Sequence, residues 1–390
     1  MTNAKISPFV AIARSIGAEV AAVHATAVDR DARFPSESIA ALKEHRMLSA
    51  YVPKALGGGG ATLGELVLAC EALSQHCTST AMIFAMHQIQ VISILRHAGD
   101  SSWFLEYMRD LVANQNLIAS VTSEVGVGGE MRSSVCGLEW EGQSFRLVKH
   151  ATTISYGAQA DDLLVTSRCT PDGPASDQVL SLVCKADYTL EQQGVWDTMG
   201  MRGTCSPPFK LSATGKKDQV ISAPFAEVAS ETMVPVSHLL WAGCWLGVAG
   251  AAVNKARAFV RMQARARPGS TPPTALRLAE VASELHMLRA SVDSALREYE
   301  QLIAAEDGSA DELSSMPYAL KINNLKVAAS RKLPEIVGQA LLICGIMGYK
   351  NDSKFSMSRH LRDAHSGALM VGNDRILATN SSMLLVLKDE

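Results

Sequence analysis

Turns that combine glycine with small hydroxyl side chains are the segments of this chain whose residue types could do chemistry. They occur at Val121–Gly129, Thr153–Ser155 and Met199–Thr204, all in the middle third of the sequence. Glycine lets a ligand approach the backbone closely, and hydroxyl and backbone N–H groups can donate hydrogen bonds to it. These segments therefore predict a binding site for a ligand that is held by short polar groups.

Several familiar catalytic patterns are missing from the sequence. Gly126–Met131 lacks the third glycine of a dinucleotide-binding GxGxxG turn, and no helical run follows it. The sequence contains no GxxxxGK[ST], HExxH or GxSxG, and its ten histidines have no metal-ligand spacing. Its eight cysteines form no CxxC pair and lie mostly in apolar segments, which favours reduced thiols. The patterns thus exclude a phosphate-loop enzyme, a triad hydrolase and a metalloenzyme.

Composition and charge indicate an ordinary globular protein. The 390 residues include 36 Lys+Arg against 39 Asp+Glu, and 47% are apolar. This balance excludes disorder and gives no support for a nucleic-acid partner. Met1–Ala13 is a poor signal peptide, and the apolar run Leu239–Val253 is shorter than the roughly 20 residues of a membrane span. We expect a cytoplasmic protein without a membrane span, in which this run forms a buried core helix.

The elements that must position the glycine-rich turns follow the order α, β, α. Apolar residues recur at helical spacing from Ile12 to Leu117, with one break at Tyr51–Gly60, and again from His238 to the end. Between them lie short runs typical of strands. The predicted strands are Leu138–Val148, Asp162–Ser167, Gln178–Val183 and Phe209–Ser212.

Several motifs, in this order, resemble the acyl-CoA dehydrogenase superfamily of flavoproteins. The matching segments are Val52–Gly60 (VPxxxGGxG), Val121–Gly129 (VTEPGAGSD), Thr153–Asp161 (WITNGxxAD), Met199–Thr204 (MGxRGS/T), and Gly345–Tyr349 with Arg362–Asp363 and Gly372 (GGxGY, RD and EGT). The resemblance implies an α+β fold with an N-terminal α-helical domain at 1–118, a middle β-barrel-like domain at 119–234 and a C-terminal four-helix-bundle domain at 235–390. It also implies FAD as the cofactor.

The resemblance assigns cofactor contacts to particular positions. Val121 and Thr122 would donate to the pyrimidine side of the flavin, and Ser155 would reach N5. Thr153 replaces a tryptophan of the family. Arg265, or Arg267 instead, would reach the pyrophosphate of a neighbouring subunit, which implies a homodimer or homotetramer. The implied cofactor set is Val121, Thr122, Thr153, Ile154, Ser155, Arg265, Ile343, Cys344, Gly345, Gly348, Asn373 and Arg375.

The catalytic carboxylate of the family is missing. Its usual position is Val371, and the other position known to carry it falls in Val236–His238. The backbone N–H of residue 371 can still donate to a thioester carbonyl. As replacement bases we consider His238 first, then His365 and Asp374. The implied substrate-binding set is Gly128, Gly129, Ser237, His238, Val371 and Gly372.

Three functions remain open on the sequence. The first is dehydrogenation of an acyl-CoA or acyl-carrier thioester, as in fatty acid metabolism, with hydride transfer to flavin N5 and a second flavoprotein as electron acceptor. The second is a flavin-dependent monooxygenase of the same fold, which needs no α-proton base. Such relatives often carry a His-Asp pair where this chain has Met370–Val371. The third is a non-catalytic protein that binds flavin or acyl-CoA.

Overall fold

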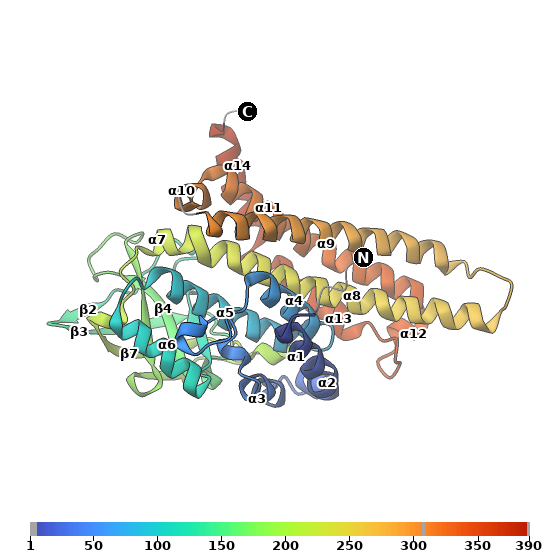
Figure 1. Ribbon diagram of the computed structural model, residues 1–390, viewed down its shortest axis with the longest axis horizontal. Coiled ribbons are helices and arrows are strands. Elements are labelled where there is room, and N and C mark those ends of the chain that lie inside the picture. The colour runs from blue at the N-terminus through green and yellow to red at the C-terminus, as the bar shows by residue number, and fades with distance from the viewer. Residues whose placement is uncertain (1–5, 129, 306–308, 388–390) are drawn as a thin grey trace.

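The computed structural model describes residues 6–128, 130–305 and 309–387 (Figure 1). A helical N-terminal part is followed by two small sheets and then by long helices. The helices before the sheets are α1 (Pro8–Ile16), α2 (Ala22–Arg30), α3 (Ser36–Glu44), α4 (Leu63–Ser74), α5 (Thr78–His97) and α6 (Ser102–Asn114).

The predicted break at Tyr51–Gly60 is a compact loop between α3 and α4. A Cβ on Gly58 would lie 2.2 Å from Val52 O, so no side chain fits there. Helix α4 then begins with a capping box, in which Thr62 Oγ1 accepts from Glu65 N and the Glu65 carboxylate accepts from Thr62 N. The loop and the cap together fix where α4 starts.

The middle of the chain forms two sheets. One has the order β1-β4-β5 and the other β2-β3-β7-β6. β1 pairs with β4 in parallel, and the other pairs are antiparallel. The strands are β1 (Ile118–Val121), β2 (Glu139–Glu141), β3 (Ser144–Ala151), β4 (Asp162–Arg168), β5 (Gln178–Cys184), β6 (Tyr188–Gln192) and β7 (Phe209–Lys216).

One predicted strand needs correction, and two strands are additional to the prediction. The single strand expected over Leu138–Val148 is a hairpin, because Gly142 with φ +62° turns the chain between β2 and β3. The strands β1 and β6 were not predicted; they have only 4 and 5 residues, too short for a clear alternating pattern.

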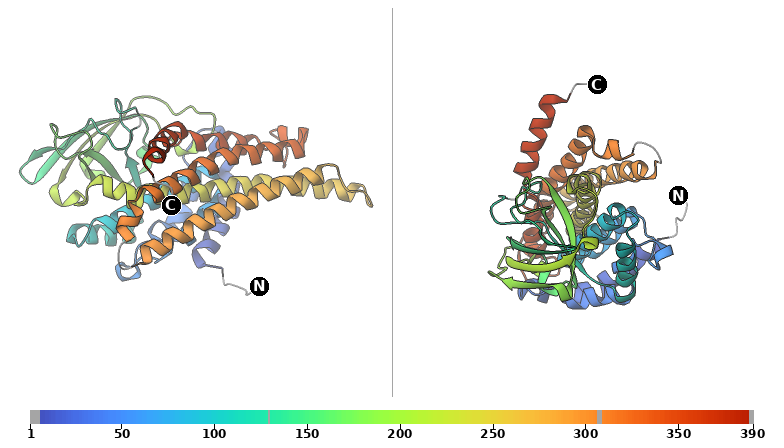
Figure 2. Two further views of the ribbon diagram at one scale, coloured as in Figure 1. Left: turned by 90° about the horizontal axis from the view of Figure 1, so that it is seen from above. Right: turned by 90° about the vertical axis from the view of Figure 1, so that its left-hand side faces the viewer.

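The C-terminal part is built on three long helices that run side by side along the long axis (Figure 2). They are α8 (Val234–Ala266), α9 (Thr274–Ala304) and α11 (Met316–Cys344), preceded by α7 (Phe225–Val228) and a π-helical turn at Ala229–Met233. α14 (Asn373–Val386) packs on α11 and then leans away from it (Figure 1). Short helices complete this part: α10 (Ser309–Leu313), α12 (Ile346–Tyr349) and α13 (Ser358–Ala364).

Three helical runs are long and apolar enough to cross a membrane by length and composition: Pro8–Arg30, Thr78–His97 and Phe225–Ala266. The apolar window of Phe225–Ala266 is completely buried inside the protein, and that of Thr78–His97 is 89% buried. The window of Pro8–Arg30 is 33% buried. Every residue of Leu239–Val253 is buried, so this run is a core helix as predicted.

Candidate functional site

The hydroxyl-bearing turns meet at one edge of the β part, which we call the β wall (residues 121–128, 130–136 and 153–155). Ser123 Oγ donates to Thr153 O at 2.6 Å and accepts from Thr153 N at 3.0 Å. One serine therefore joins the turn after β1 to the turn after β3. Val121, Thr122, Thr153, Ile154 and Ser155 are brought together in this way, as the predicted cofactor set requires.

Ser155 belongs to a short chain of hydroxyl groups. Its Oγ accepts from Ser206 Oγ at 2.9 Å, and Ser206 Oγ lies 2.9 Å from Thr204 Oγ1. The Met199–Thr204 motif is thus linked to the Thr153–Ser155 turn by hydrogen bonds through Ser206. The same motif contacts α13, because Met201 N donates to Asp363 Oδ1 at 2.7 Å. Two motifs that are far apart in the sequence therefore meet behind the β wall.

Glu124 organises the glycine-rich loop, a role that sequence reasoning missed. Its buried carboxylate accepts from Ser134 Oγ at 2.7 Å, Val135 N at 3.1 Å and Cys136 N at 2.6 Å. Lys149 Nζ lies 3.6 Å from the same carboxylate, is fully buried, and has a pKa lowered by burial. Only the fold could reveal this pair, since Lys149 stands on an alternating strand where a charged side chain normally faces solvent.

The opposite side of the site is helical, and we call it the helical wall (His238, Lys326 and residues 369–375). Val371 has φ +45°, although a β-branched residue rarely adopts a left-handed conformation. Its carbonyl accepts from Lys326 Nζ at 2.9 Å. Lys326 Nζ also donates to Asn373 Oδ1 at 2.8 Å, and Asn373 Nδ2 donates to Ser330 Oγ at 3.0 Å. The Asn373 side chain is therefore used inside the protein.

His238 lies in the core of the helical wall. Its Nδ1 is 3.3 Å from Ile322 O, and because a carbonyl can only accept, Nδ1 carries the proton. Burial, together with the nearby positive charge of Lys326, lowers the pKa of His238 to about 3. An imidazole with this pKa is a weak base, so its environment disfavours the proton-abstracting role predicted for it.

The other base candidates and Ser237 show no better arrangement. His365 and Asp374 are both exposed. Ser237 Oγ donates back to Met233 O within its own helix. Val371 is 42% exposed, and nothing lies within 4 Å of a Cβ built on Gly372. The turn at 371–372 is thus an open part of the helical wall without a carboxylate.

The two walls approach each other at Gly128 and Arg375. Arg375 Nη2 lies 3.4 Å from the position that a Cβ on Gly128 would take. Both residues are exposed, and Gly128 has φ +56°. Gly129, also predicted to bind substrate, lies outside the described residues. The geometry places a guanidinium beside a glycine-rich loop, an arrangement that suits an anionic group.

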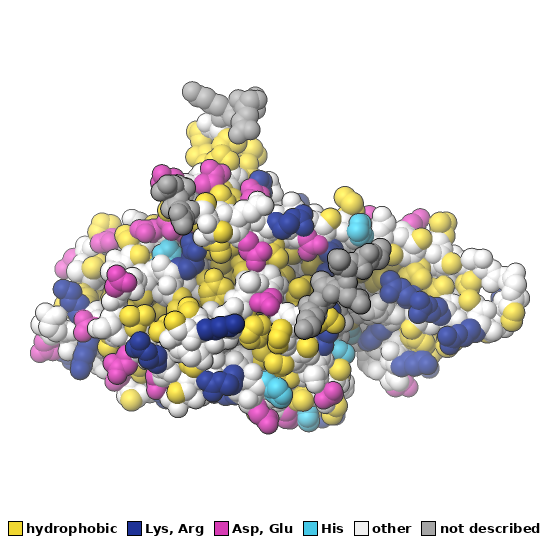
Figure 3. Space-filling model, viewed as in Figure 1, with side chains coloured by type: hydrophobic (Ala, Val, Ile, Leu, Met, Phe, Trp, Pro, Cys, Tyr) yellow, Lys and Arg dark blue, Asp and Glu magenta, His cyan; other side chains and the backbone are white. Residues whose placement is uncertain are grey.

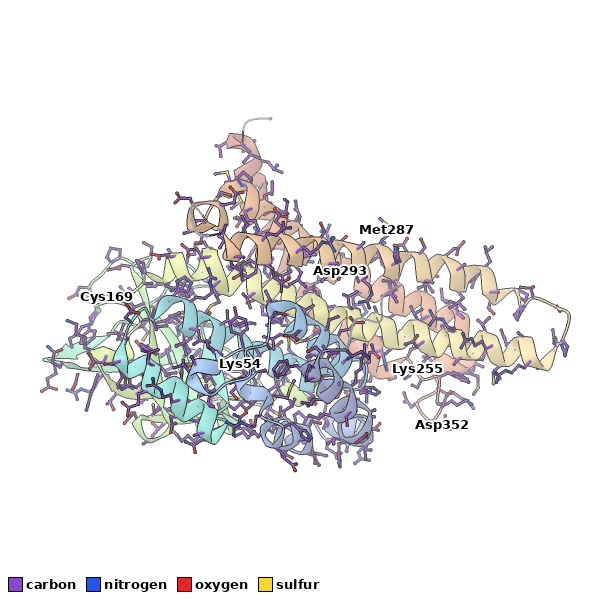
Figure 4. The ribbon with its side chains drawn as sticks, viewed as in Figure 1. Lys54, Cys169, Lys255, Met287, Asp293 and Asp352 are labelled. Carbon is purple, nitrogen blue, oxygen red and sulfur yellow. The ribbon has the colours of Figure 1, made fainter. Side chains whose placement is uncertain are left out.

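The remaining predicted cofactor residues lie far from these walls in the same chain. Arg265 is exposed near the C-terminal end of α8, at the opposite end of the molecule from the sheets (Figure 1). Ile343 and Cys344 are 2% and 1% exposed, so their side chains face the core. Gly345 precedes α12 and Gly348 lies within it. The loop after α12 is held to α8 by Lys255 Nζ, which donates to Ser356 O at 2.8 Å (Figure 4 labels Lys255). One chain does not bring this group to the β wall.

Comparison with known proteins places these observations in a family. The family models described as "Acyl-CoA dehydrogenase, N-terminal domain" and "Acyl-CoA dehydrogenase, C-terminal domain" match residues 7–115 and 227–383. The chain is 24% identical over 354 residues to the amino sugar nitrososynthase DnmZ of Streptomyces peucetius, covering 88% of this chain and 84% of that protein. It is 23% identical over 381 residues to a dibenzothiophene monooxygenase of Mycolicibacterium goodii, covering 88% and 86%.

Solved structures share the fold over nearly the whole chain. FMN-bound TdsC from Paenibacillus sp. A11-2 has a TM-score of 0.84 at 17% identity and covers 97% of each chain. Butyryl-CoA dehydrogenase from Megasphaera elsdenii has a TM-score of 0.81 at 19% identity and also covers 97% of each chain. The predicted fold class is confirmed. The chain belongs to the acyl-CoA dehydrogenase family of flavin oxidoreductases.

Proposed function

We propose that this protein is a flavin-dependent monooxygenase that uses reduced flavin and oxygen to oxygenate an organic substrate. The observation that carries the proposal is the helical wall. The family's carboxylate positions hold Val371 and the segment Val236–His238, and His238 is a buried, weakly basic imidazole. A site that lacks a base suits a reaction that begins on the flavin rather than with removal of a substrate proton.

The β wall fits a flavin ring. Among the described residues, Thr122 Oγ1 and the backbone N–H of Ser155 have no protein hydrogen-bond partner, so both can donate to a ring edge. Reduced flavin supplies the oxygen activation that side chains cannot perform. The chain's own residues hold the ring, and Arg375 beside Gly128 can meet a phosphate. Two relatives, the protein of Mycolicibacterium goodii and TdsC of Paenibacillus sp. A11-2, are named dibenzothiophene monooxygenases, which agrees with this reaction class.

The balance of the reaction requires an external reductant. One reduced flavin, one oxygen molecule and the substrate give oxidised flavin, oxygenated substrate and water. We propose that a separate flavin reductase supplies the reduced flavin, so that the partner flavoprotein delivers electrons rather than accepting them. FMN can serve this cycle as well as FAD, because both carry the same redox-active ring.

The exposed apolar side chains favour a homo-oligomer. Leu342 and Ile346 near the end of α11 are 58% and 67% exposed, and Leu384 and Leu385 on α14 are 58% and 87% exposed. Figure 3 shows apolar side chains gathered on the projecting helix α14. Such patches mark interaction surfaces. A second copy would also bring Arg265 toward a flavin that one chain leaves far away, and light scattering on the purified protein tests this assembly.

The amounts of oxygenated product and hydrogen peroxide formed from reduced flavin test the proposed reaction. The protein is supplied with chemically reduced FMN or FAD in air, with and without a panel of aromatic and amino-sugar substrates. We expect product formation to rise at the expense of hydrogen peroxide when a substrate is accepted. If peroxide forms at the rate of free flavin with every substrate, and the protein does not retain flavin, the proposal is wrong.

Dehydrogenation of an acyl thioester is the second candidate, favoured by the backbone N–H that position 371 retains. It predicts rapid bleaching of protein-bound oxidised flavin by an acyl-CoA without oxygen. We expect no such bleaching, since general-base catalysis contributes about 10²–10⁴-fold and neither of the family's two base positions, Val371 and Val236–His238, holds a carboxylate. Bleaching by any acyl-CoA of the panel would restore dehydrogenation as the function.

A further inference from the structure

A buried lysine lies directly behind the open turn of the helical wall. Lys326 of α11 is completely buried, and among the described residues no Asp or Glu forms an ion pair with it. Its ammonium donates to Val371 O at 2.9 Å and to Asn373 Oδ1 at 2.8 Å. A buried charge without a counterion lowers the stability of the fold, so we expect the Lys326 ammonium to have a role through the residues that it contacts.

The turn that Lys326 contacts is strained. Val371 adopts φ +45°, and residues held in this region persist only when their surroundings over-determine them. Lys326 binds the backbone of Val371 and the side chain of Asn373, and Ser330 holds Asn373 from a second direction. One ammonium therefore clamps the turn on both sides of Gly372.

The clamp also borders His238. The Lys326 charge disfavours a second proton on that imidazole. The groups that face the ammonium are thus His238 from α8, Asn373 from α14, Ser330 from its own helix and the carbonyl of Val371.

We infer that Lys326 is a positioning residue of the proposed oxygenation site, which holds the Val371–Asn373 turn in its strained conformation. This inference rests on the proposed function only in assigning the turn to an oxygenation site. The conformation of the turn itself can be tested without turnover.

Hydrogen exchange of the backbone amides at 366–376 tests the inference on the whole protein. We compare wild type with Lys326→Met, which keeps the length of the side chain but removes its donors. Loss of a charge-assisted hydrogen bond should accelerate exchange of this segment about tenfold or more. The matched control is Lys332→Met on the same helix, since Lys332 is half-exposed and pairs with Glu284 and Glu335. Unchanged exchange at 366–376 in a folded Lys326→Met protein overturns the inference.

Two further measurements keep the test decisive. In a Val371→Gly background the positive φ costs little, so Lys326→Met should accelerate exchange less than it does in wild type. If Lys326→Met fails to fold, wild type is studied from pH 7 to pH 10 instead. Burial lowers the pKa of Lys326 to about 8. Protection of 366–376 should then fall above pH 8 relative to α5, and a constant ratio overturns the inference.

The outcomes separate this inference from the proposed function. If exchange responds as expected but reduced flavin gives no oxygenated product, the function is wrong and the positioning role stands. If oxygenation is found but exchange at the turn ignores Lys326, the function stands and the positioning role is wrong.

Discussion

The β wall and the helical wall are held together in different ways. On the β wall, Ser123 and Glu124 join loops through hydrogen bonds that are largely to backbone groups. On the helical wall, a strained valine is held by a buried lysine that has no counterion among the described residues. The cofactor side therefore follows the family pattern, whereas the reaction side departs from it.

This difference teaches how a new reaction can arise within one fold. A flavin ring needs the same donors whatever reaction it serves, so the wall that we propose to hold it is expected to keep its loops. The reacting side decides which bond is broken, and here one carboxylate position has become apolar. Fold likeness alone does not assign the reaction, because the chemistry belongs to the site.

The largest expected effect comes from restoring the carboxylate with Val371→Glu. If the β wall holds flavin as in acyl-CoA dehydrogenases, this variant should gain acyl-CoA-driven flavin bleaching by about 10²–10⁴-fold over wild type. The measurement is the anaerobic absorbance of the bound flavin after acyl-CoA is added. Val371→Leu is the control. Equal bleaching rates for the Glu and Leu variants would mean that more than the base has changed on the helical wall.

Breaking the buried pair on the β wall should come next. Glu124→Ala leaves Lys149 buried without its anion and removes three hydrogen bonds, so the free energy of unfolding should fall by about 3–5 kcal/mol. Urea unfolding measures this value. Exposed Glu139 on β2 is the matched control, and its alanine variant should change stability by less than about 0.5 kcal/mol. Similar losses for both variants would contradict the role given to Glu124.

Acid should destabilise the protein through His87, which connects the N-terminal helices to the start of β1. His87 Nε2 donates to Leu48 O at 2.8 Å, and its Nδ1 accepts from Ile118 N at 3.1 Å, so a second proton would break a bond. Burial lowers the pKa of His87 to about 4. Between pH 6.5 and 4, residue 87 binds the extra proton in the unfolded chain but not in the folded protein. This residue alone therefore lowers the free energy of unfolding by about 1.4 kcal/mol for each unit by which the pH decreases.

The free energy of unfolding at several pH values measures that slope. His87→Gln should reduce the slope by about 1.4 kcal/mol per pH unit, with the rest coming from His97 and His238, whose pKa values burial also lowers. His45→Gln, at an exposed position, should leave the slope unchanged. If the His87→Gln slope equals that of wild type, other buried groups dominate the acid response.

The smallest expected effect comes from Ser155→Ala. The hydroxyl of Ser155 makes one neutral hydrogen bond with Ser206, so its loss should weaken flavin binding by less than about tenfold. Quenching of flavin fluorescence gives the dissociation constant. Ser144→Ala, at an exposed position of β3, should not change it. A loss well above tenfold would show that the Ser155 side chain, and not only its backbone, holds the ring.

Much of the fold could be predicted because its signals are local. Helical periodicity and the glycine break at Tyr51–Gly60 depend only on neighbouring residues. Short strands such as β1 gave no such signal, and the hairpin at Gly142 was read as one strand. The cofactor turns were found through motifs, which the structure then brought together through Ser123.

Glu124, Lys149 and Lys326 could not be found in the same way. A lysine in a sequence is expected at the surface, and nothing near Lys149 or Lys326 marks it as buried. Each is placed by strands or helices that meet only after folding. The sequence also could not show that the side chain of Asn373, predicted to contact flavin, is hydrogen-bonded to Lys326 and Ser330 inside the protein.

The sequence by itself determined the α, β, α order, the family and the absence of a carboxylate at position 371, because residue identity and spacing are properties of the chain alone. The tertiary structure decided that His238 is neutral and weakly basic, and that Val371 is held in a left-handed turn by Lys326. Burial and charge proximity set pKa values and strain, and both depend on residues that only the fold brings together.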